Sequence, residues 1–264
     1  MQTKMDYDTL HVTLEGKTAI IELNRPKSLN AMNIPLLREL LNCLTELKKD
    51  KSIQILILKG KGGAFSSGGD IKEMLAMASE QEFHSIMETI GNIAVTLYTM
   101  PKVTIAGIHG AAAGLGLSLA LACDYLICEE DSKLAMNFIG IGLIPDGGGH
   151  FFMEQRLGVA KAKQMIWKGK VIGGQEALLK GMVEEVVAAG KLDEAVESYT
   201  KKCLHSPLQA MIKTKNILTT NHAPKLIKML EMEKEGQWTM RQTKDHQEGV
   251  QAFIEKRKPK FQGE

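Results

Sequence analysis

The sequence predicts an α/β fold in which buried parallel strands alternate with helices, followed by a helical C-terminal region. Two nearly continuous apolar runs, at residues 53–58 and 103–108, are typical of strands buried on both faces of a sheet. Each run leads into a glycine-rich turn and then into a helical pattern, which indicates β-α units with ligand-binding turns at the strand ends. From about residue 190 onward only helical patterns remain.

The other elements are assigned from periodicity and turn residues. Further strands are expected at residues 8–14, 17–23 and 125–128, the first two joined as a hairpin. Helices, several of them bounded by proline, are expected at residues 34–49, 71–78, 81–99, 117–122, 192–204, 207–220, 224–243 and 245–257. We therefore divide the chain into a core at 1–190 and a helical oligomerisation region at 191–264.

Composition limits the function classes. The net charge of +2 and the 5% aromatic content give no support for binding nucleic acid or a membrane. The four cysteines lack the spacing of a zinc site and fit a reducing cytoplasm better than a disulfide framework. The N-terminal segment has no signal-peptide pattern, and no apolar run is long enough to span a membrane. We expect a cytoplasmic protein.

The two glycine-rich turns carry the strongest chemical signal. They read AFSSGGD at residues 64–70 and GAAAGLG at residues 110–116. Each opens a helix, where the first backbone N–H groups lack intrahelical acceptors and the helix dipole favours negative charge. Two such turns converging on one point would hold an oxyanion, which predicts chemistry on a carbonyl whose oxygen gains charge, such as an enolate. The alternative is that they are tight connections that need positive φ angles.

Three familiar motifs are excluded by missing residues. The first turn lacks the Lys-Ser/Thr ending of a P-loop, and residues 114–116 lack the third glycine of a dinucleotide fingerprint. The segment around Ser118 lacks the second glycine of a nucleophile elbow.

Five segments, in this order, resemble the crotonase superfamily, that is, the enoyl-CoA hydratase/isomerase family. They are LNRPKSLNAM at 23–32, FSSGGDIK at 65–72, GAAAG followed by LALACD within 110–124, GLIPDGG at 142–148, and EGVQAFIEKR at 248–257. The resemblance implies a crotonase-like β-β-α spiral with a C-terminal helical trimerisation region, assembled as a homotrimer or a dimer of trimers. It also implies an acyl-CoA thioester substrate, with no metal and no cofactor beyond the coenzyme A of the substrate.

The resemblance also assigns site residues. It implies that the oxyanion donors are the backbone N–H groups of Ser67 and Leu115. The nucleotide end of coenzyme A is expected near the C-terminus, in many relatives against a neighbouring subunit. The residues expected to contact the substrate are Lys27, Asn30, Ser67, Gly68, Gly69, Asp70, Leu115, Phe253 and Lys256.

The acid–base residues depart from those of hydratases. The two hydratase glutamates fall on Ser118 and Phe138, and neither side chain can serve as the carboxylate that hydration needs. Asp146 matches the acidic residue of single-carboxylate enoyl-CoA isomerases. One base can take a proton from C2 and return it at C4 while the oxyanion hole stabilises the dienolate. The resemblance therefore implies an isomerase with Asp146 as its base.

Several alternatives stay open at this point. Asp146 could cap the helix that follows it. The reaction could be hydration or another enolate reaction, such as decarboxylation or dehalogenation. The chain could also be a catalytically silent acyl-CoA-binding subunit. His109 and His150 are expected to be structural, and His84 to be solvated.

Overall fold

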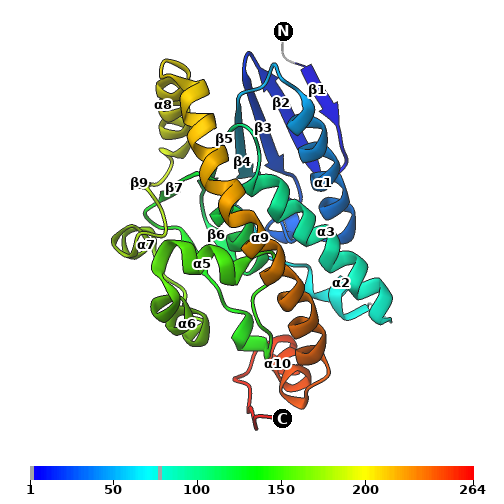
Figure 1. Cartoon of the computed structure of the whole chain (residues 1–264). Helices are drawn as coiled ribbons and strands as arrows, with labels where there is room; N and C mark the ends of the chain where they lie inside the picture. The colour runs from blue at the N-terminus through cyan, green and yellow to red at the C-terminus, as the bar shows by residue number, and fades with distance from the viewer. Residues whose placement is uncertain (1–2, 77–78) are drawn as a thin grey trace.

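The computed structural model describes the backbone of residues 3–76 and 79–264, and it consists of a sheet with helices packed on both faces (Figure 1). The seven-stranded sheet has the order β1-β2-β3-β4-β5-β7-β9. The pairs β1–β2 and β2–β3 are antiparallel, and all following pairs are parallel. The strands of this sheet are β1 (Thr3–Asp6), β2 (Leu10–Glu15), β3 (Thr18–Leu23), β4 (Ile55–Gly60), β5 (Val103–Ile108), β7 (Tyr125–Glu129) and β9 (Glu185–Val187).

The helices alternate with strands as predicted, and additional helices occur where none was predicted. They are α1 (Ile34–Lys49), α2 (Ile71–Ala76), α3 (Glu80–Tyr98), α4 (Leu115–Leu121), α5 (Gly149–Leu157), α6 (Val159–Lys168), α7 (Gly174–Lys180), α8 (Leu192–Leu204), α9 (Leu208–Arg241) and α10 (Lys244–Ile254), with the 3-10 turns η1 (Pro26–Ser28) and η2 (Phe138–Ile141). The predicted bounds of α1, β5 and α8 are confirmed. The end of the predicted helix 71–78 lies outside the described residues. No element was expected from the sequence at β1 or in the region of α5, α6 and α7.

The central strands are apolar throughout because both faces of the sheet are covered. In β4, Leu56 and Leu58 belong to the large core on the side of α1 and α3. Ile55 and Ile57, which point the other way, pack in a second core together with residues of α8 and the start of α9. Alternate residues of a strand face opposite sides, so a strand buried on both sides shows no polar alternation.

A separate two-stranded sheet carries the second glycine turn. The strands β6 (Ala111–Ala113) and β8 (Lys133–Ala135) pair in parallel. From β6 the chain passes through Gly114 directly into α4, which begins at Leu115 rather than at the predicted residue 117. The first residues of this helix therefore belong to the turn itself.

The C-terminal helices are part of the main packing arrangement. Helix α8 packs on β5 and β7, and α9 packs on α3 and α5. Because Leu192, Val196 and Ile212 contribute to a core shared with the sheet, the boundary at residue 191 marks a change in secondary structure and not a separately packed unit. The oligomerisation role of residues 191–264 stays a prediction.

Helix α9 corrects one prediction. Residues 207–220 and 224–243 were expected to form two helices, but they form one helix of 34 residues with Pro224 inside it. Proline removes one backbone hydrogen bond and normally interrupts a helix. Here Leu226, two residues later, is fully buried in the main core, and Thr219 and Lys215 are buried on the preceding turns. Tertiary packing on both sides of the proline therefore maintains the helix.

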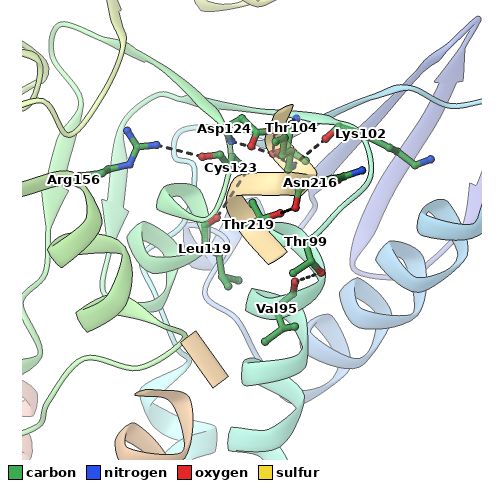
Figure 2. A network of polar contacts seen from close by, with 11 residues as sticks. Val95, Thr99, Lys102, Thr104, Leu119, Cys123, Asp124, Arg156, Asn216 and Thr219 are labelled. Atoms are coloured by element: carbon green, nitrogen blue, oxygen red, sulfur yellow. Dashed lines mark hydrogen bonds and ion pairs between the residues drawn. The ribbon is translucent and has the colours of Figure 1, made fainter. Parts of the chain in front are cut away.

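A partly buried polar network ties α9 to the end of α4 and to β5 (Figure 2). The Lys215 ammonium group donates to the Asp124 carboxylate at 2.8 Å and to the carbonyl oxygen of Lys102 at 2.9 Å. The same Asp124 oxygen accepts from the backbone N–H of Thr104 at 2.8 Å and from its hydroxyl group at 2.9 Å. Asp124 lies just beyond α4, so this network fixes the far end of the helix that begins at the second glycine turn.

We expect Lys215→Met to lower the free energy of unfolding by about 2 kcal/mol, because it leaves the Asp124 carboxylate, whose side chain is 31% exposed, and the Lys102 carbonyl oxygen without their charged donor. Urea unfolding at neutral pH measures the effect. Adding Asp124→Asn should restore part of the loss by removing the unpaired charge. Lys191→Met, which breaks an exposed ion pair with Glu194, is the control and should cost less than about 1 kcal/mol. Equal losses for the two lysines would contradict this assignment.

Candidate active site

The two glycine-rich turns lie against each other. The Ser66 N–H donates to the Ala111 carbonyl at 2.9 Å, and the Ala113 N–H donates to the Ser66 carbonyl at 3.0 Å. Gly68 has φ +102°, and a Cβ atom there would lie 2.8 Å from the Ala113 carbonyl oxygen and 3.6 Å from the Leu115 nitrogen. The predicted convergence of the turns is therefore confirmed, and it depends on the missing side chain of Gly68.

One predicted oxyanion donor is wrong. The Ser67 N–H donates to the Leu29 carbonyl at 2.9 Å, so it is not free for a substrate. The Gly68 N–H is also used, by the Ser66 hydroxyl group at 3.1 Å. Within the described part of the chain, the N–H of Gly69 has no hydrogen-bond acceptor, although its neighbour Asp70 donates to Met32. The free donor of the first turn is therefore Gly69.

The N–H group of Leu115, the other expected donor, is also free within the part of the chain that the structure describes. Leu115 is the first residue of α4 and follows Gly114 at the helix N-cap. Its N–H has no acceptor among the residues from 3 to 76 and from 79 to 264. The N–H groups of Gly69 and Leu115 are thus the free donors at the two apposed turns, where the dipole of α4 adds positive potential.

The loop before α1 supports the first turn. Asn30 was predicted to contact coenzyme A, but its side chain is fully buried. Its amide group donates to the carbonyl oxygens of Lys61 and Ala64, and its amide oxygen accepts from the Arg25 N–H at 2.8 Å. Because all polar atoms of this side chain have partners inside the protein, the predicted contact of Asn30 with coenzyme A is wrong, and the side chain instead holds this loop.

Of the other residues predicted to contact the substrate, Asp70 has a partner within the protein, whereas Lys27, Phe253 and Lys256 are exposed. The Asp70 carboxylate forms an ion pair with Arg25 at 3.1 Å, which joins the first turn to the loop. Lys27 is exposed on η1. Phe253, on α10, is 59% exposed, and Lys256 is exposed just after it. No described contact brings the last three to the two turns within this chain, so their contacts with coenzyme A stay predictions.

Asp146 lies in a loop that packs against the start of α4. Gly147 has φ +61°, and a Cβ atom there would lie 2.5 Å from the Leu115 Cδ1 atom and 3.5 Å from the Ser118 Cβ atom. The Leu115 side chain therefore points toward the Asp146 loop and lines the interior beside it. Phe138 approaches the same turn, since a Cβ atom on Gly114 would lie 3.5 Å from its ring. The fold thus gathers Ser118, Phe138 and the Asp146 loop around the second donor.

The Asp146 side chain is buried and only partly satisfied. It is 2% exposed, and its Oδ1 atom has no hydrogen-bond partner among the described residues. Burial raises the pKa of Asp146 well above its ordinary value, and the nearby charge of Glu233 raises it further. A carboxyl group in this setting holds a proton tightly, as a base with a raised pKa does in many active sites.

The N-terminus of α5 is capped by Glu233 and not by Asp146. The Glu233 carboxylate, on α9, accepts from the backbone N–H groups of Gly148 at 2.8 Å and of His150 at 3.0 Å. It also contacts the Nδ1 atom of His150 at 2.8 Å. The N-cap residue of α5 is Gly148, and no side chain of the loop itself caps the helix. The capping alternative for Asp146 is therefore wrong.

Sequence analysis missed Glu233. It lies 85 residues from Gly148, so local motifs cannot connect the two. One signal was present, because Glu233 follows Leu226 and Leu230 at helical spacing and so falls on the face that α9 buries. A charged residue on such a face needs buried partners.

Other kinds of site receive no support from the described residues. They contain no group of three or more His, Cys, Asp or Glu side chains placed to hold a metal ion. All four cysteines are buried free thiols. None of the described helices combines the length and apolarity needed to cross a lipid bilayer.

At the contact between the two turns, Gly68 and its neighbour Gly69 should differ in how well they tolerate a side chain. Gly68→Ala should lower the free energy of unfolding by about 1–3 kcal/mol, because its φ is left-handed and the new methyl group meets a backbone carbonyl that cannot move aside. Gly69→Ala should be nearly neutral, since it meets only the flexible Met74 sulfur at 3.0 Å. Urea unfolding of both variants tests this difference. Equal costs would contradict the packing described here.

Comparison with known proteins gives a consistent result. The family model described as "Enoyl-CoA hydratase/isomerase" matches residues 14–264. The chain is 47% identical to a Bacillus subtilis protein named as an enoyl-CoA hydratase/isomerase, YhaR, over 94% of this chain and 96% of that protein. It is 29% identical to the trans-2-decenoyl-[acyl-carrier-protein] isomerase of Streptococcus mutans, over 98% and 100%.

The fold agrees with this relationship. The crystal structure of an enoyl-CoA hydratase from Mycobacterium avium subsp. paratuberculosis superimposes with a TM-score of 0.88 at 29% identity, covering 97% of this chain and all of that one. The predicted crotonase-like α/β fold with its helical C-terminal region is thereby confirmed. The chain belongs to the enoyl-CoA hydratase/isomerase family.

Proposed function

We propose that this chain is an isomerase that shifts a carbon–carbon double bond in an enoyl thioester, with Asp146 as its one acid–base residue. The observation that carries the proposal is the buried Asp146 carboxyl group, which lies beside the second donor turn and whose Oδ1 atom has no hydrogen-bond partner among the described residues. The two positions at which hydratases hold glutamates are Ser118 and Phe138, and both lie at this same turn without a carboxylate.

The proposed reaction uses the two free backbone donors first. The thioester oxygen binds the N–H groups of Gly69 and Leu115, which lowers the energy of negative charge on that oxygen. The Asp146 carboxylate takes a proton from C2 of a 3-enoyl thioester, and the electrons of the C–H bond pass into a dienolate. Asp146 then returns the proton to C4, which leaves the double bond between C2 and C3. The enzyme ends unchanged, so no metal and no cofactor beyond the thioester carrier take part.

The raised pKa of Asp146 fits this task. A proton next to a thioester is weakly acidic, and a more basic carboxylate abstracts it more readily. The same property lets the carboxylic acid hold the proton until the dienolate accepts it. A water-accessible aspartate of ordinary pKa would be a weaker base.

The carrier of the acyl chain is a separate question. The family name supports a coenzyme A thioester, whereas one relative is named as an isomerase acting on an acyl-carrier-protein thioester. Other relatives are named as probable enoyl-CoA hydratases. We propose the coenzyme A thioester as the substrate, with hydration as the second candidate reaction. We also propose the assembly that the family resemblance implies, a homotrimer or a dimer of trimers, and the cytoplasmic location that the composition of the sequence predicts.

The reaction can be tested with two thioesters. Wild-type protein should convert 3-hexenoyl-CoA to the conjugated 2-enoyl product, seen as a gain of thioester absorbance. Asp146→Asn should lower this rate by ~10²–10⁴-fold, because it removes the group that moves the proton. Asp193→Asn, the same change at an exposed ion pair with Lys59, is the control and should keep wild-type activity.

The alternatives give different results in the same assay. Loss of absorbance with crotonyl-CoA would favour hydration. The absence of turnover with both substrates would favour a silent binding subunit. Equal rates for wild type and Asp146→Asn would overturn the assignment of the base.

The buried carboxyl group should also affect stability. The pKa of Asp146 is raised in the folded protein above the value of about 3.9 expected for the unfolded chain. The folded state therefore binds the extra proton, and wild-type stability should fall as pH rises from about 4 toward the folded-state pKa. Asp146→Asn lacks this loss, so it should be more stable than wild type at neutral pH, with a difference that shrinks below about pH 4. Urea unfolding across this range measures the difference. A variant less stable than wild type at neutral pH would contradict the prediction.

A further inference from the structure

Helix α9 holds the Asp146 loop at both ends. On one side, the Gln237 amide group donates to the Ile144 carbonyl oxygen. On the other, the Glu233 carboxylate accepts from the N–H groups of Gly148 and His150. Between these contacts α9 presents Gly236, where a Cβ atom would lie 2.5 Å from the Ile144 Cδ1 atom. The loop is therefore pressed against the backbone of α9 around the residue that bears the reacting carboxyl group.

We propose that Glu233 is a positioning residue that keeps a negative charge beside Asp146 and thereby sets the strength of Asp146 as a base. The role rests on the proposed function, in which Asp146 moves the proton. Glu233 is 2% exposed, and its carboxylate accepts from the backbone N–H groups of Gly148 and His150 at the start of α5 and contacts the Nδ1 atom of His150. Its charge is held where the aqueous solvent does not screen it.

The second charge acts by making ionisation of Asp146 less favourable. Two carboxylates that share one buried site cannot both ionise easily, so one of them retains a proton. The donors of α5 point at Glu233, whereas Oδ1 of Asp146 has no partner among the described residues. The two carboxyl groups thus have different surroundings, since backbone donors hold Glu233 while Asp146 keeps one oxygen without a described partner.

The other titratable groups around the loop are few. His150 faces Glu233 from α5, and α4 carries none. On α3, His84 packs on Trp238 of α9, and its buried Nε2 atom lacks a described partner, which corrects the expectation that it is solvated. Glu88, also on α3, pairs with Lys234 near the surface. His150 is thus the group most able to mimic a pH effect of Glu233, and it needs its own control.

The pH dependence of isomerisation tests the proposal. In wild type, kcat/KM should rise as Asp146 ionises, with its midpoint above the ordinary carboxyl range. Glu233→Gln should move this rise to lower pH and lower the limiting rate by at most about tenfold, less than the loss from removing the base itself. Glu233→Asp, which keeps the charge on a shorter side chain, should restore the midpoint toward wild type. His150→Gln should leave the rise in place, because Asp146 and Glu233 remain.

A measurement without turnover separates this proposal from the proposed function. Infrared spectroscopy should detect a buried carboxylic acid band that is absent in Asp146→Asn and that titrates at lower pH in Glu233→Gln. If Glu233→Gln does not fold, Glu233→Asp carries the test, because it keeps the charge and should keep the band and the kcat/KM midpoint near the wild-type pH; a midpoint in the ordinary carboxyl range would overturn the role. A Glu233→Gln protein with the wild-type midpoint and band would overturn the role of Glu233, even if Asp146 proves essential. A second control introduces Glu233→Gln into a protein that already carries His150→Gln. If the midpoint then no longer shifts, the effect belongs to the histidine and the role of Glu233 is overturned.

Discussion

The site depends on one close approach, that of the backbone of Gly68 to the strand that leads into α4. The space between Gly68 and the Ala113 carbonyl oxygen does not admit even a methyl group. Gly116 makes a similar contact on the other side, where a Cβ atom would lie 2.7 Å from the Ser66 Cβ atom. With no side chain between them, the two turns bring the free N–H groups of Gly69 and Leu115 to one face. Every other feature of the site is arranged around these donors.

The second constraint is the burial of charge at the start of α5. A helix N-terminus inside a protein needs acceptors for its first N–H groups. A residue of the preceding loop usually supplies them. Here Glu233 supplies them from the distant helix α9, and the loop residue Asp146 is left with an oxygen that has no partner. The same contact that completes α5 therefore leaves a carboxyl group available for chemistry. This contact also requires α9 to continue as one helix across Pro224. The residues of α9 that pack in the second core, which they share with the sheet, precede Pro224, whereas Leu226 and Glu233 follow it.

The sequence was most informative where chemistry is local. The sequence could predict the apolar runs of β4 and β5, the glycine turns and α1. In each case the residues that determine the local structure lie within the segment itself. The wrong donor, Ser67, and the wrong contact, Asn30, share a different origin. In both cases the way the loop before α1 folds over the turn decides the hydrogen-bond partners. Ser67 donates to Leu29, and the Asn30 side chain is held by Lys61, Ala64 and Arg25. Glu233 was missed for the same reason. Short motifs identify which segments form a site, but the tertiary packing decides which polar atoms in them remain free.

The environment of Asp146 also bears on the choice between moving a double bond and adding water. Hydration needs a water molecule held by two carboxylates at the reacting carbon atoms. At this turn the corresponding positions carry a buried serine and a phenylalanine ring, and the Leu115 side chain fills the space against Gly147. A phenylalanine ring and a leucine side chain offer water no hydrogen bond, and the Ser118 hydroxyl group is not a carboxylate base. A dienolate formed here would meet one proton donor, the Asp146 acid that produced it. In the proposed reaction, selectivity for isomerisation therefore follows from the absence of carboxylates that could hold a water molecule as much as from the presence of the base.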